Sequence, residues 1–258
     1  MKEILRFNNV SLRYQADNGE VEALKDICLC VEEGELVSVV GPSGCGKTTL
    51  LSLAAGLESP TSGEVLICGD KVRGVSGKMG YMLQKDSLLD WRTIRGNVLI
   101  GLEIRGARNK ENIEYADSLL KNYGLWEFRE KHPSQLSGGM RQRAALIRTL
   151  AVKPEILLLD EAFSALDYQT RLVVADDVFN ILRREKKTAI IVTHDIAECI
   201  GMADRIIVIS KRPGRVSMDF PVKFTNGCAD EMPPLKRRDD PSFREYFNLI
   251  RKELGIDG

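Results

Sequence analysis

One stretch decides the fold of this chain: Gly41-Pro42-Ser43-Gly44-Cys45-Gly46-Lys47-Thr48-Thr49. It follows an apolar run at residues 36–40 and leads into a second apolar run at residues 50–55. The order is therefore buried strand, glycine-rich turn and helix, which is the context that the pattern G-x-x-x-x-G-K-[ST] requires. Glycines let successive backbone N–H groups point inward around an anion, and the helix directs its positive end at the same place. The stretch predicts a site for a nucleoside triphosphate.

The whole stretch from Gly41 to Thr49 is predicted to bind the nucleoside triphosphate, and three of its side chains have separate roles. Lys47 brings a positive charge to the β- and γ-phosphates, and the Thr48 hydroxyl can hold Mg²⁺. Cys45 lies at a helix N-terminus, where a thiolate is favoured, so we expect a reactive thiol. The alternative is a plain glycine turn with an exposed lysine and threonine, and it requires the pattern and both flanks to coincide by chance.

Composition narrows the class of protein. The chain has 258 residues, of which 43% are hydrophobic and 29% charged, enough for one large domain with a subdomain. Lys plus Arg and Asp plus Glu both number 37, so no basic footprint for nucleic acid is predicted. No apolar run reaches the roughly 20 residues of a membrane span, and residues 1–6 lack a secretory pattern. The six cysteines form no C-x-x-C pair, which favours reduced thiols in a cytosolic protein.

Hydrophobic periodicity predicts an α/β fold with a mainly parallel sheet. Strands are expected at 4–14, twice within 21–40, and at 64–68, 79–83, 156–160, 188–193 and 205–209. Helices are expected after the glycine-rich stretch up to Gly56, and at 94–103, 112–123, 125–129, 138–150, 169–185, 195–202 and 242–254. Turns are expected at 17–19, 32–35 and 60–63, and strand and loop at 211–241. The predominantly helical region from residue 84 predicts a subdomain inserted into the nucleotide-binding core.

The strand at 156–160 ends in two adjacent carboxylates, Asp160 and Glu161. A carboxylate at the end of a buried strand beside a phosphate loop can hold Mg²⁺, which is the role predicted for Asp160. Glu161, one residue further, can activate an attacking water as a general base. The alternative is an apolar strand followed by a solvated acidic turn.

Ser137, Gly138 and Gly139 open another predicted helix and so form a second candidate anion site. Alone they would be an ordinary helix cap. Because the Asp160–Glu161 pair follows some twenty residues later, the combination resembles the signature of the ABC ATPase family. The resemblance covers residues 4–215. It implies a P-loop core with a mainly parallel sheet, an N-terminal antiparallel β subdomain and an inserted helical subdomain, all within one domain: 1–83 and 156–258 as the core, and 84–155 as the insertion.

Four further residues match family landmarks. Gln84 resembles the glutamine of the Q-loop and would serve catalysis and Mg²⁺, and Asp167, in the stretch 164–167, resembles the D-loop aspartate. His194 resembles the switch histidine that contacts the γ-phosphate, and Tyr14 resembles the aromatic that stacks on adenine. Each has an ordinary alternative: Gln84 as a loop residue, Asp167 and His194 as caps, and Tyr14 as a core aromatic.

Stretches 88–98, 136–143 and 210–215 resemble the ATP-binding subunits of nitrate, sulfonate and taurine importers, a group that includes relatives moving thiamine precursors or other small anions and heterocycles. Asp90 stands where those relatives often have proline, so the identity of the partner permease is not predicted. Met140 replaces the glutamine of the wider family. The stretch 85–91 links Gln84 to the helical region, and its apolar residues Leu88, Leu89 and Trp91 predict a docking surface for a permease helix. The alternative is that these three pack the core of the subdomain.

The resemblance implies an ATP-hydrolysing motor that works as a head-to-tail homodimer with two ATP molecules at the interface. Its partners would be membrane permease subunits and, indirectly, a solute-binding protein, and it would lie on the cytoplasmic face of the membrane. The alternative is an SMC-type ATPase acting on DNA, or an ABC ATPase acting on ribosomes. SMC proteins have a long coiled coil between the two motifs, whereas only residues 85–136 separate Gln84 from Ser137 here. The sequence predicts neither the solute nor a role for residues 216–258.

Overall fold

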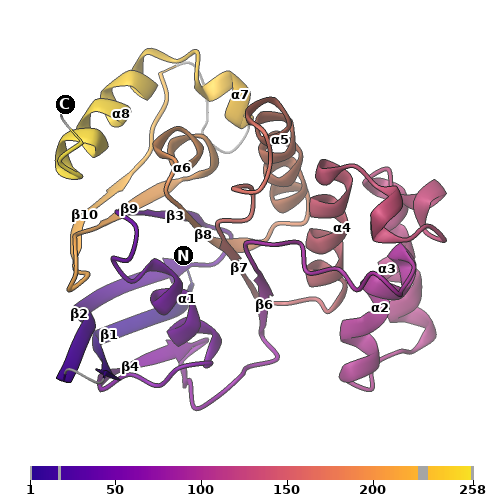
Figure 1. Ribbon diagram of the computed structural model, residues 1–258, viewed down its shortest axis with the longest axis horizontal. Coiled ribbons are helices and arrows are strands. Elements are labelled where there is room, and N and C mark those ends of the chain that lie inside the picture. The colour runs from indigo at the N-terminus through magenta and orange to yellow at the C-terminus, as the bar shows by residue number, and fades with distance from the viewer. Residues whose placement is uncertain (1, 17–18, 226–231, 257–258) are drawn as a thin grey trace.

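The computed structural model describes residues 2–16, 19–225 and 232–256 (Figure 1). Met1, Asp17, Asn18 and Cys228 lie outside the described residues, and so does part of the turn predicted at 17–19. The five other cysteines are free thiols, as predicted. Within the described ranges, no helix is both long and apolar enough to cross a lipid bilayer.

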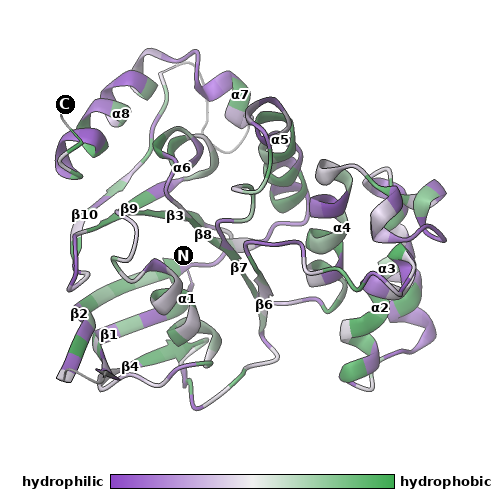
Figure 2. Cartoon of the chain, in the orientation of Figure 1, coloured by the Kyte–Doolittle hydropathy of each residue, from purple (hydrophilic) through white to green (hydrophobic). Residues whose placement is uncertain are grey.

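A six-stranded sheet forms the centre of the molecule. Its strands lie in the order β10 (Val216–Pro221), β9 (Arg205–Ile209), β3 (Leu36–Val40), β8 (Thr188–Thr193), β7 (Ile156–Asp160) and β6 (Met79–Met82). All neighbours are parallel except β10, which is antiparallel to β9. Every residue of β3, β7 and β8 is buried, as expected for parallel strands covered on both faces. Figure 2 shows these strands as a hydrophobic band through the molecule.

Alternate side chains of the central strands enter two different cores. Leu157 and Leu159 join α2 (Ile94–Ile104), α4 (Gly138–Ala151) and α5 (Tyr168–Arg184) on one face. Ile156 and Leu158 pack on the other face with α1 (Lys47–Ala55) and the second sheet. A third cluster joins β9 to α6 (Ile196–Met202) and α8 (Pro241–Glu253). The period of two in β7 therefore positions the helices on both sides of the sheet.

The second sheet is antiparallel and joins strands from the first part of the chain. Its order is β2 (Gly19–Glu32), β1 (Glu3–Ala16), β4 (Ser62–Ile67) and β5 (Asp70–Lys71). The predicted strands of this region are present, and β5 is an addition. Helix α1 lies between the two sheets (Figure 1) and ends, as predicted, at Gly56 in the left-handed conformation.

Helices α2, α3 (Lys110–Asn122) and α4 pack together at one side of the molecule (Figure 1). Two short 3-10 turns, Trp126–Phe128 and Pro133–Gln135, follow α3. The helix predicted at 125–129 is present only as the 3-10 turn at Trp126–Phe128: Gly124 is left-handed and ends α3, and the new turn has no side-chain cap. The indole of Trp126 lies between the cations of Lys121 and Arg129, which are 4.5 and 4.3 Å from the ring centre.

The last part of the chain covers α5 and α6 through α7 (Pro234–Arg237) and α8. Helix α7 lies in the region predicted as strand and loop, and its Arg237 is fully buried. Arg237 donates to the Ala203 carbonyl at 2.7 Å and to the Met232 carbonyl at 2.8 Å. Its guanidinium carbon also lies 4.6 Å from the ring of Phe179 and 5.2 Å from that of Phe224. This arginine fixes the C-terminal segment to the core.

Candidate active site

The phosphate loop connects β3 to α1 and is packed tightly against other strands. Gly44 and Gly46 are left-handed, with φ of 73° and 107°. A Cβ on Gly46 would lie 2.6 Å from a methyl carbon of Leu24, and one on Gly41 would lie 2.7 Å from the Ile209 carbonyl oxygen. Glycine is therefore required by backbone conformation at Gly44 and Gly46, and by lack of space at Gly41 and Gly46.

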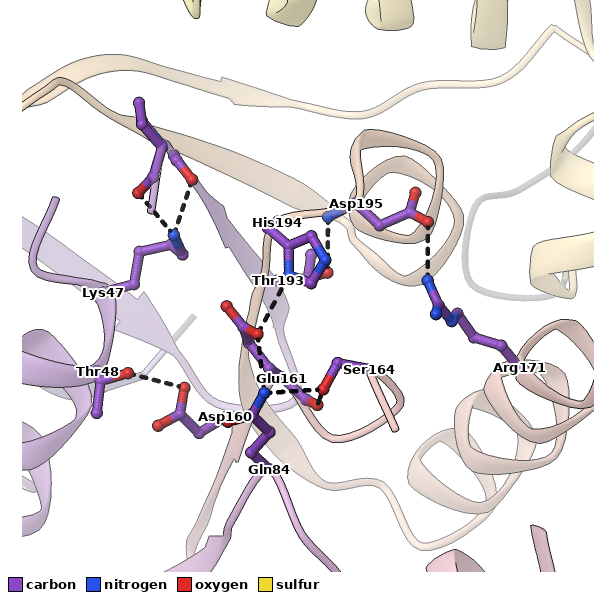
Figure 3. Close-up of polar contacts among 12 residues, drawn as sticks. Lys47, Thr48, Gln84, Asp160, Glu161, Ser164, Arg171, Thr193, His194 and Asp195 are labelled. Atoms are coloured by element: carbon purple, nitrogen blue, oxygen red, sulfur yellow. Dashed lines mark hydrogen bonds and ion pairs between the residues drawn. The ribbon is translucent and has the colours of Figure 1, made fainter. Parts of the chain in front are cut away.

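Lys47 is buried in the curl of this loop, with only 6% of its surface exposed. Its ammonium donates to the carbonyls of Gly41 at 2.7 Å and Pro42 at 3.0 Å (Figure 3). The charge thus lies among the loop residues whose amides were predicted to surround the phosphates. The structure agrees with the sequence on the location of this cation.

The prediction of a reactive Cys45 thiol is wrong. Its side chain is 1% exposed, and burial raises the pKa of the thiol. The Lys47 ammonium, 4.0 Å from the sulfur, lowers this pKa by less than burial raises it. Desolvation of the thiolate therefore outweighs the helix terminus and the nearby cation.

Asp160 ends β7 and faces the first turn of α1. One carboxylate oxygen accepts the Thr48 hydroxyl at 3.2 Å, and the other accepts the Tyr81 hydroxyl at 3.1 Å. Burial raises the pKa of Asp160, although both hydrogen bonds lower it. The sequence brought Thr48 and Asp160 together correctly but missed Tyr81, because the pairing of β6 with β7 that places it here cannot be read from either strand.

Glu161 is the meeting point of three strand ends (Figure 3). It is left-handed, with φ of 46°, and its backbone N–H donates to the Val192 carbonyl at 2.9 Å. Its carboxylate lies 3.1 Å from Nδ1 of His194 and 3.4 Å from Nε2 of Gln84. Gln84 also donates to the Ser164 hydroxyl at 3.2 Å. Gln84 therefore contacts Glu161 rather than the Thr48–Asp160 pair.

Tyr14 lies on β1, near the start of α1. It is 38% exposed, and its hydroxyl lies 3.5 Å from that of Thr49. The structure thus contradicts the alternative that Tyr14 packs in the core. Its ring is accessible next to the phosphate loop.

Ser137 begins α4 and Asp167 begins α5, and both side chains are exposed caps. The Ser137 hydroxyl accepts the Met140 N–H at 3.3 Å, and the Asp167 carboxylate accepts the Thr170 N–H at 3.0 Å. The hydrogen bond with Thr170 lowers the pKa of Asp167. Among the described residues, neither cap hydrogen-bonds to the phosphate loop. The structure thus brings together all the predicted catalytic residues except Asp167.

Sequence reasoning missed a buried acid, Glu198, in α6 just after His194. Glu198 is 6% exposed, one of its carboxyl oxygens has no hydrogen-bond partner, and burial raises its pKa to about 8. The pattern Asp195-x-x-Glu198 is that of a capping box, in which the acid would turn back to the start of the helix rather than into the core. Asp195 does cap α6, whereas Glu198 turns into the core.

A protein-family model described as ABC transporter matches residues 24–164, more than half of the chain and the part that holds the phosphate loop, Ser137 and Glu161. This chain belongs to the ABC transporter family. As an ABC protein it is 45% identical over 250 residues to an uncharacterised ABC transporter ATP-binding protein, YtlC, of Bacillus subtilis, covering 97% of this chain and 95% of that one. It is 38% identical to the taurine import ATP-binding protein TauB of Roseobacter denitrificans, covering 95% and 93%.

A solved ABC structure has the same fold. It is the dimeric ATP-binding cassette MJ0796 in a post-hydrolysis state bound to ADP and Pi, with a TM-score of 0.72 and 33% identity, covering 85% of this chain and 99% of that chain. The predicted α/β fold of an ABC ATPase is therefore confirmed, and so is ATPase activity as the activity of this chain.

Proposed function

We propose that this ABC ATPase is the motor of an importer, which moves a small solute through separate membrane permease subunits. The names of the taurine import relatives and the three stretches that resemble the nitrate, sulfonate and taurine group support this. The solute would be an anion of that kind or a related small molecule. The chain would lie at the cytoplasmic face of the membrane, and a solute-binding protein would deliver the cargo to the permease.

The observation that carries the hydrolytic site is the convergence of Glu161, His194 and Gln84 next to the Thr48–Asp160 pair. In the proposed reaction, Lys47 and the loop amides hold the phosphates, and Tyr14 stacks on adenine. Glu161 takes a proton from the attacking water, and His194 contacts the γ-phosphate while it holds the Glu161 carboxylate. Positioning of the reacting groups and electrostatic stabilisation of the transition state provide most of the catalysis, as phosphoryl transfer generally requires.

The oxygen donors of Thr48 and Asp160 fit Mg²⁺. No group of three or more His, Cys, Asp or Glu side chains in the described ranges forms a closed metal cage. Mg²⁺ suits a site of this kind, since it keeps several waters and takes one or two protein oxygens together with substrate phosphates. Bound there with ATP, it would neutralise charge on the phosphates, and Gln84 would reach it only by leaving Glu161.

We propose that a second copy of this chain completes the site. The N-terminus of α4, capped by the exposed Ser137, would face the γ-phosphate held by the partner's phosphate loop. Asp167, equally exposed, would contact the partner's site. The dimeric state of the solved relative supports this arrangement.

We further propose that residues 84–155 act as a subdomain that receives a permease helix. Trp91 is 75% exposed, so it is not a core residue, whereas Leu88 is buried and Leu89 half-buried, contrary to the sequence prediction for those two. Arg148 holds the carbonyls of Asp86 and Ser87 at 2.7 and 2.6 Å. A cavity of about 300 Å³ between β6, α2 and α4 is lined by Met79, Gly80, Tyr81, Ile100, Gly101, Ile104, Arg105, Arg148, Thr149 and Val152.

The docking proposal is tested by Trp91→Ala. Because the indole is exposed, the isolated ATPase should keep its melting temperature and its turnover. Association with the permease, measured by co-purification from membranes, should be lost. Leu88→Ala is the contrasting variant, since removing a buried leucine should destabilise the fold by about 2–5 kcal/mol. A Trp91→Ala protein that still co-purifies in full would exclude this surface.

The proposed hydrolytic role of Glu161 is tested by Glu161→Gln. Glutamine keeps the shape but cannot take a proton, so turnover should fall by about 10²- to 10⁴-fold while ATP binding persists. An ATP-bound dimer should accumulate on gel filtration. Glu155→Gln, an exposed position just before β7, is the control and should behave as the parent. Near-parental ATPase activity in Glu161→Gln would disprove the assignment.

A further inference from the structure

Arg171, in the first turn of α5, connects two loops that hold proposed functional residues. One terminal nitrogen of its guanidinium lies 3.4 Å from the Asp195 carboxylate, and the other donates to the Leu166 carbonyl at 3.1 Å (Figure 3 shows the first contact). Asp195 directly follows His194, and Leu166 directly precedes Asp167. One planar group therefore joins the loop of the histidine to the loop of the aspartate.

The two oxygens of Asp195 have separate tasks. Oδ1 accepts the N–H groups of Ala197 at 2.8 Å and Glu198 at 3.1 Å and so caps α6, whereas Oδ2 faces Arg171. The Asp195 N–H donates to the Thr193 hydroxyl at 3.0 Å. Since cap and ion pair use different oxygens, asparagine, which keeps one side-chain oxygen as an acceptor, can cap α6 without the ion pair.

The Leu166 end of this connection reaches the start of α4. A Cβ on Gly138 would lie 3.0 Å from a methyl carbon of Leu166, and one on Gly139 would lie 2.9 Å from a methyl carbon of Val174 in α5. The loop that Arg171 holds thus packs on Gly138 through Leu166, and α5, the helix that carries Arg171, packs on Gly139. A displacement of Leu166 cannot occur without disturbing that packing.

We propose that Arg171 and Asp195 are positioning residues that couple His194 to the Asp167 loop and to the Ser137 end of α4 in the same chain. The proposal rests on the proposed function of those three residues. When the γ-phosphate leaves and His194 loses its contact, the change at Asp195 is passed through the guanidinium to Leu166. The surface that would face a second copy therefore responds to the state of the chain's own ATP.

Both side chains are partly buried, with 23% and 27% of their surfaces exposed, so an ion pair that serves stability alone is the competing explanation. The molecule contains a matched control on the same helix. Arg183, at the other end of α5, pairs with Asp204, and these side chains are 18% and 20% exposed. That pair lies outside the loops of His194 and Asp167.

The test uses Asp195→Asn, Arg171→Gln and the double variant of the full chain, with Asp204→Asn as control. Asparagine caps helices about as well as aspartate, so Asp195→Asn removes the charge and keeps the cap. We expect each single variant to lower kcat by about tenfold with little change in KM for ATP. Because the two side chains are in contact and their effects are coupled, the double variant should be no slower than the single ones. Asp204→Asn should keep the parental kcat even where it lowers the melting temperature.

Multiplying losses in the double variant, or an equal loss of kcat in Asp204→Asn, would overturn the coupling and leave a purely stabilising ion pair. Parental kcat in Asp195→Asn would overturn it as well. These outcomes are separate from a failure of the proposed function. If Glu161→Gln retains turnover, the hydrolytic assignment fails whatever Asp195→Asn does; if Glu161→Gln is inactive and Asp195→Asn is not, only the coupling fails.

Discussion

Two helices of this molecule begin with glycines, and their surroundings differ. The start of α1 is enclosed by its own chain: Lys47 and Asp160 are each 6% exposed, and the carboxylate of Asp160 meets the Thr48 hydroxyl. The start of α4 carries an exposed Ser137, whose hydroxyl caps its own helix. In Figure 1 the two helices lie on opposite sides of β6 and β7.

The difference shows what each helix end can do alone. The α1 end has a buried cation, a buried carboxylate and a candidate general base within one chain. The α4 end offers N–H groups and a dipole but no catalytic partner among the described residues of its own chain. We infer that the first end binds ATP in a single chain, whereas the second acts only on ATP brought by another.

Ser137→Arg should give the largest effect and separates the two ends most clearly. The cation and its bulk would occupy the place proposed for the partner's γ-phosphate, so ATP turnover should fall about a hundredfold or more, as when a donor to a developing charge is lost. ATP affinity of the monomer should persist, measured by calorimetry. Ser134→Arg, an exposed position just before it, is the control. If Ser137→Arg dimerises normally with ATP, the two ends do not differ in this way.

Lys47→Ala changes the start of α1 and should weaken the binding of ATP itself. Loss of a charged hydrogen-bond donor to the phosphates should cost about 1.5–3 kcal/mol, or roughly 10- to 150-fold in the Kd for ATP. Calorimetry on the isolated chain measures this, with Lys110→Ala at an exposed position of α3 as control. Equal affinity in parent and Lys47→Ala would mean that the buried ammonium contributes nothing to ATP binding.

Glu198→Gln tests the buried carboxyl of α6, which lies near Asp195 and Glu161, and should give the smallest effect. Burial raises the pKa of Glu198 from 4.5 to about 8. Between those values the folded protein keeps a proton that the unfolded chain has released, so the free energy of unfolding falls as pH rises, by up to about 1.4 kcal/mol per pH unit from this group. Glutamine removes that contribution.

The measurement for Glu198 is urea unfolding at about pH 5.5 and about pH 7.5, within the interval where the effect operates. Glu198→Gln should lose less stability than the parent between the two conditions. Glu245→Gln, at an exposed position of α8, should change as the parent does. An identical change in the parent and Glu198→Gln would show that this carboxyl does not retain its proton on folding.

The sequence predicted those features that local chemistry determines. The strand, glycine turn and helix around Lys47 follow from a hydrophobic run and two left-handed glycines, and β7 follows from its apolar run and its two terminal carboxylates. The roles of Gln84 and His194 were predicted from the family resemblance, and that of Glu161 also from its place at the end of β7. Their short distances depend on the order of β6, β7 and β8 in the sheet, which no single segment encodes.

The features that were missed or wrong depend on burial. Cys45 has a helix N-terminus in its sequence context, but only packing shows that solvent is excluded from its sulfur. Leu88 and Trp91 lie three residues apart in one apolar stretch, yet one is buried and the other is 75% exposed. Arg171 is a polar residue on an amphipathic helix, and nothing in its neighbours along the chain indicates that it contacts Asp195, 24 residues further on.

The burial of Arg237 has a consequence for how the protein is made. The carbonyl of Ala203 and the ring of Phe179 belong to elements that leave the ribosome before residue 237 does. Until that arginine arrives, the carbonyl lacks this donor, and the ring has the guanidinium of Arg183 over it but not that of Arg237. The final packing of α5 and α6 therefore waits for α7 and α8 to be synthesised, and a chain cut short before α7 would leave apolar side chains of α6 exposed.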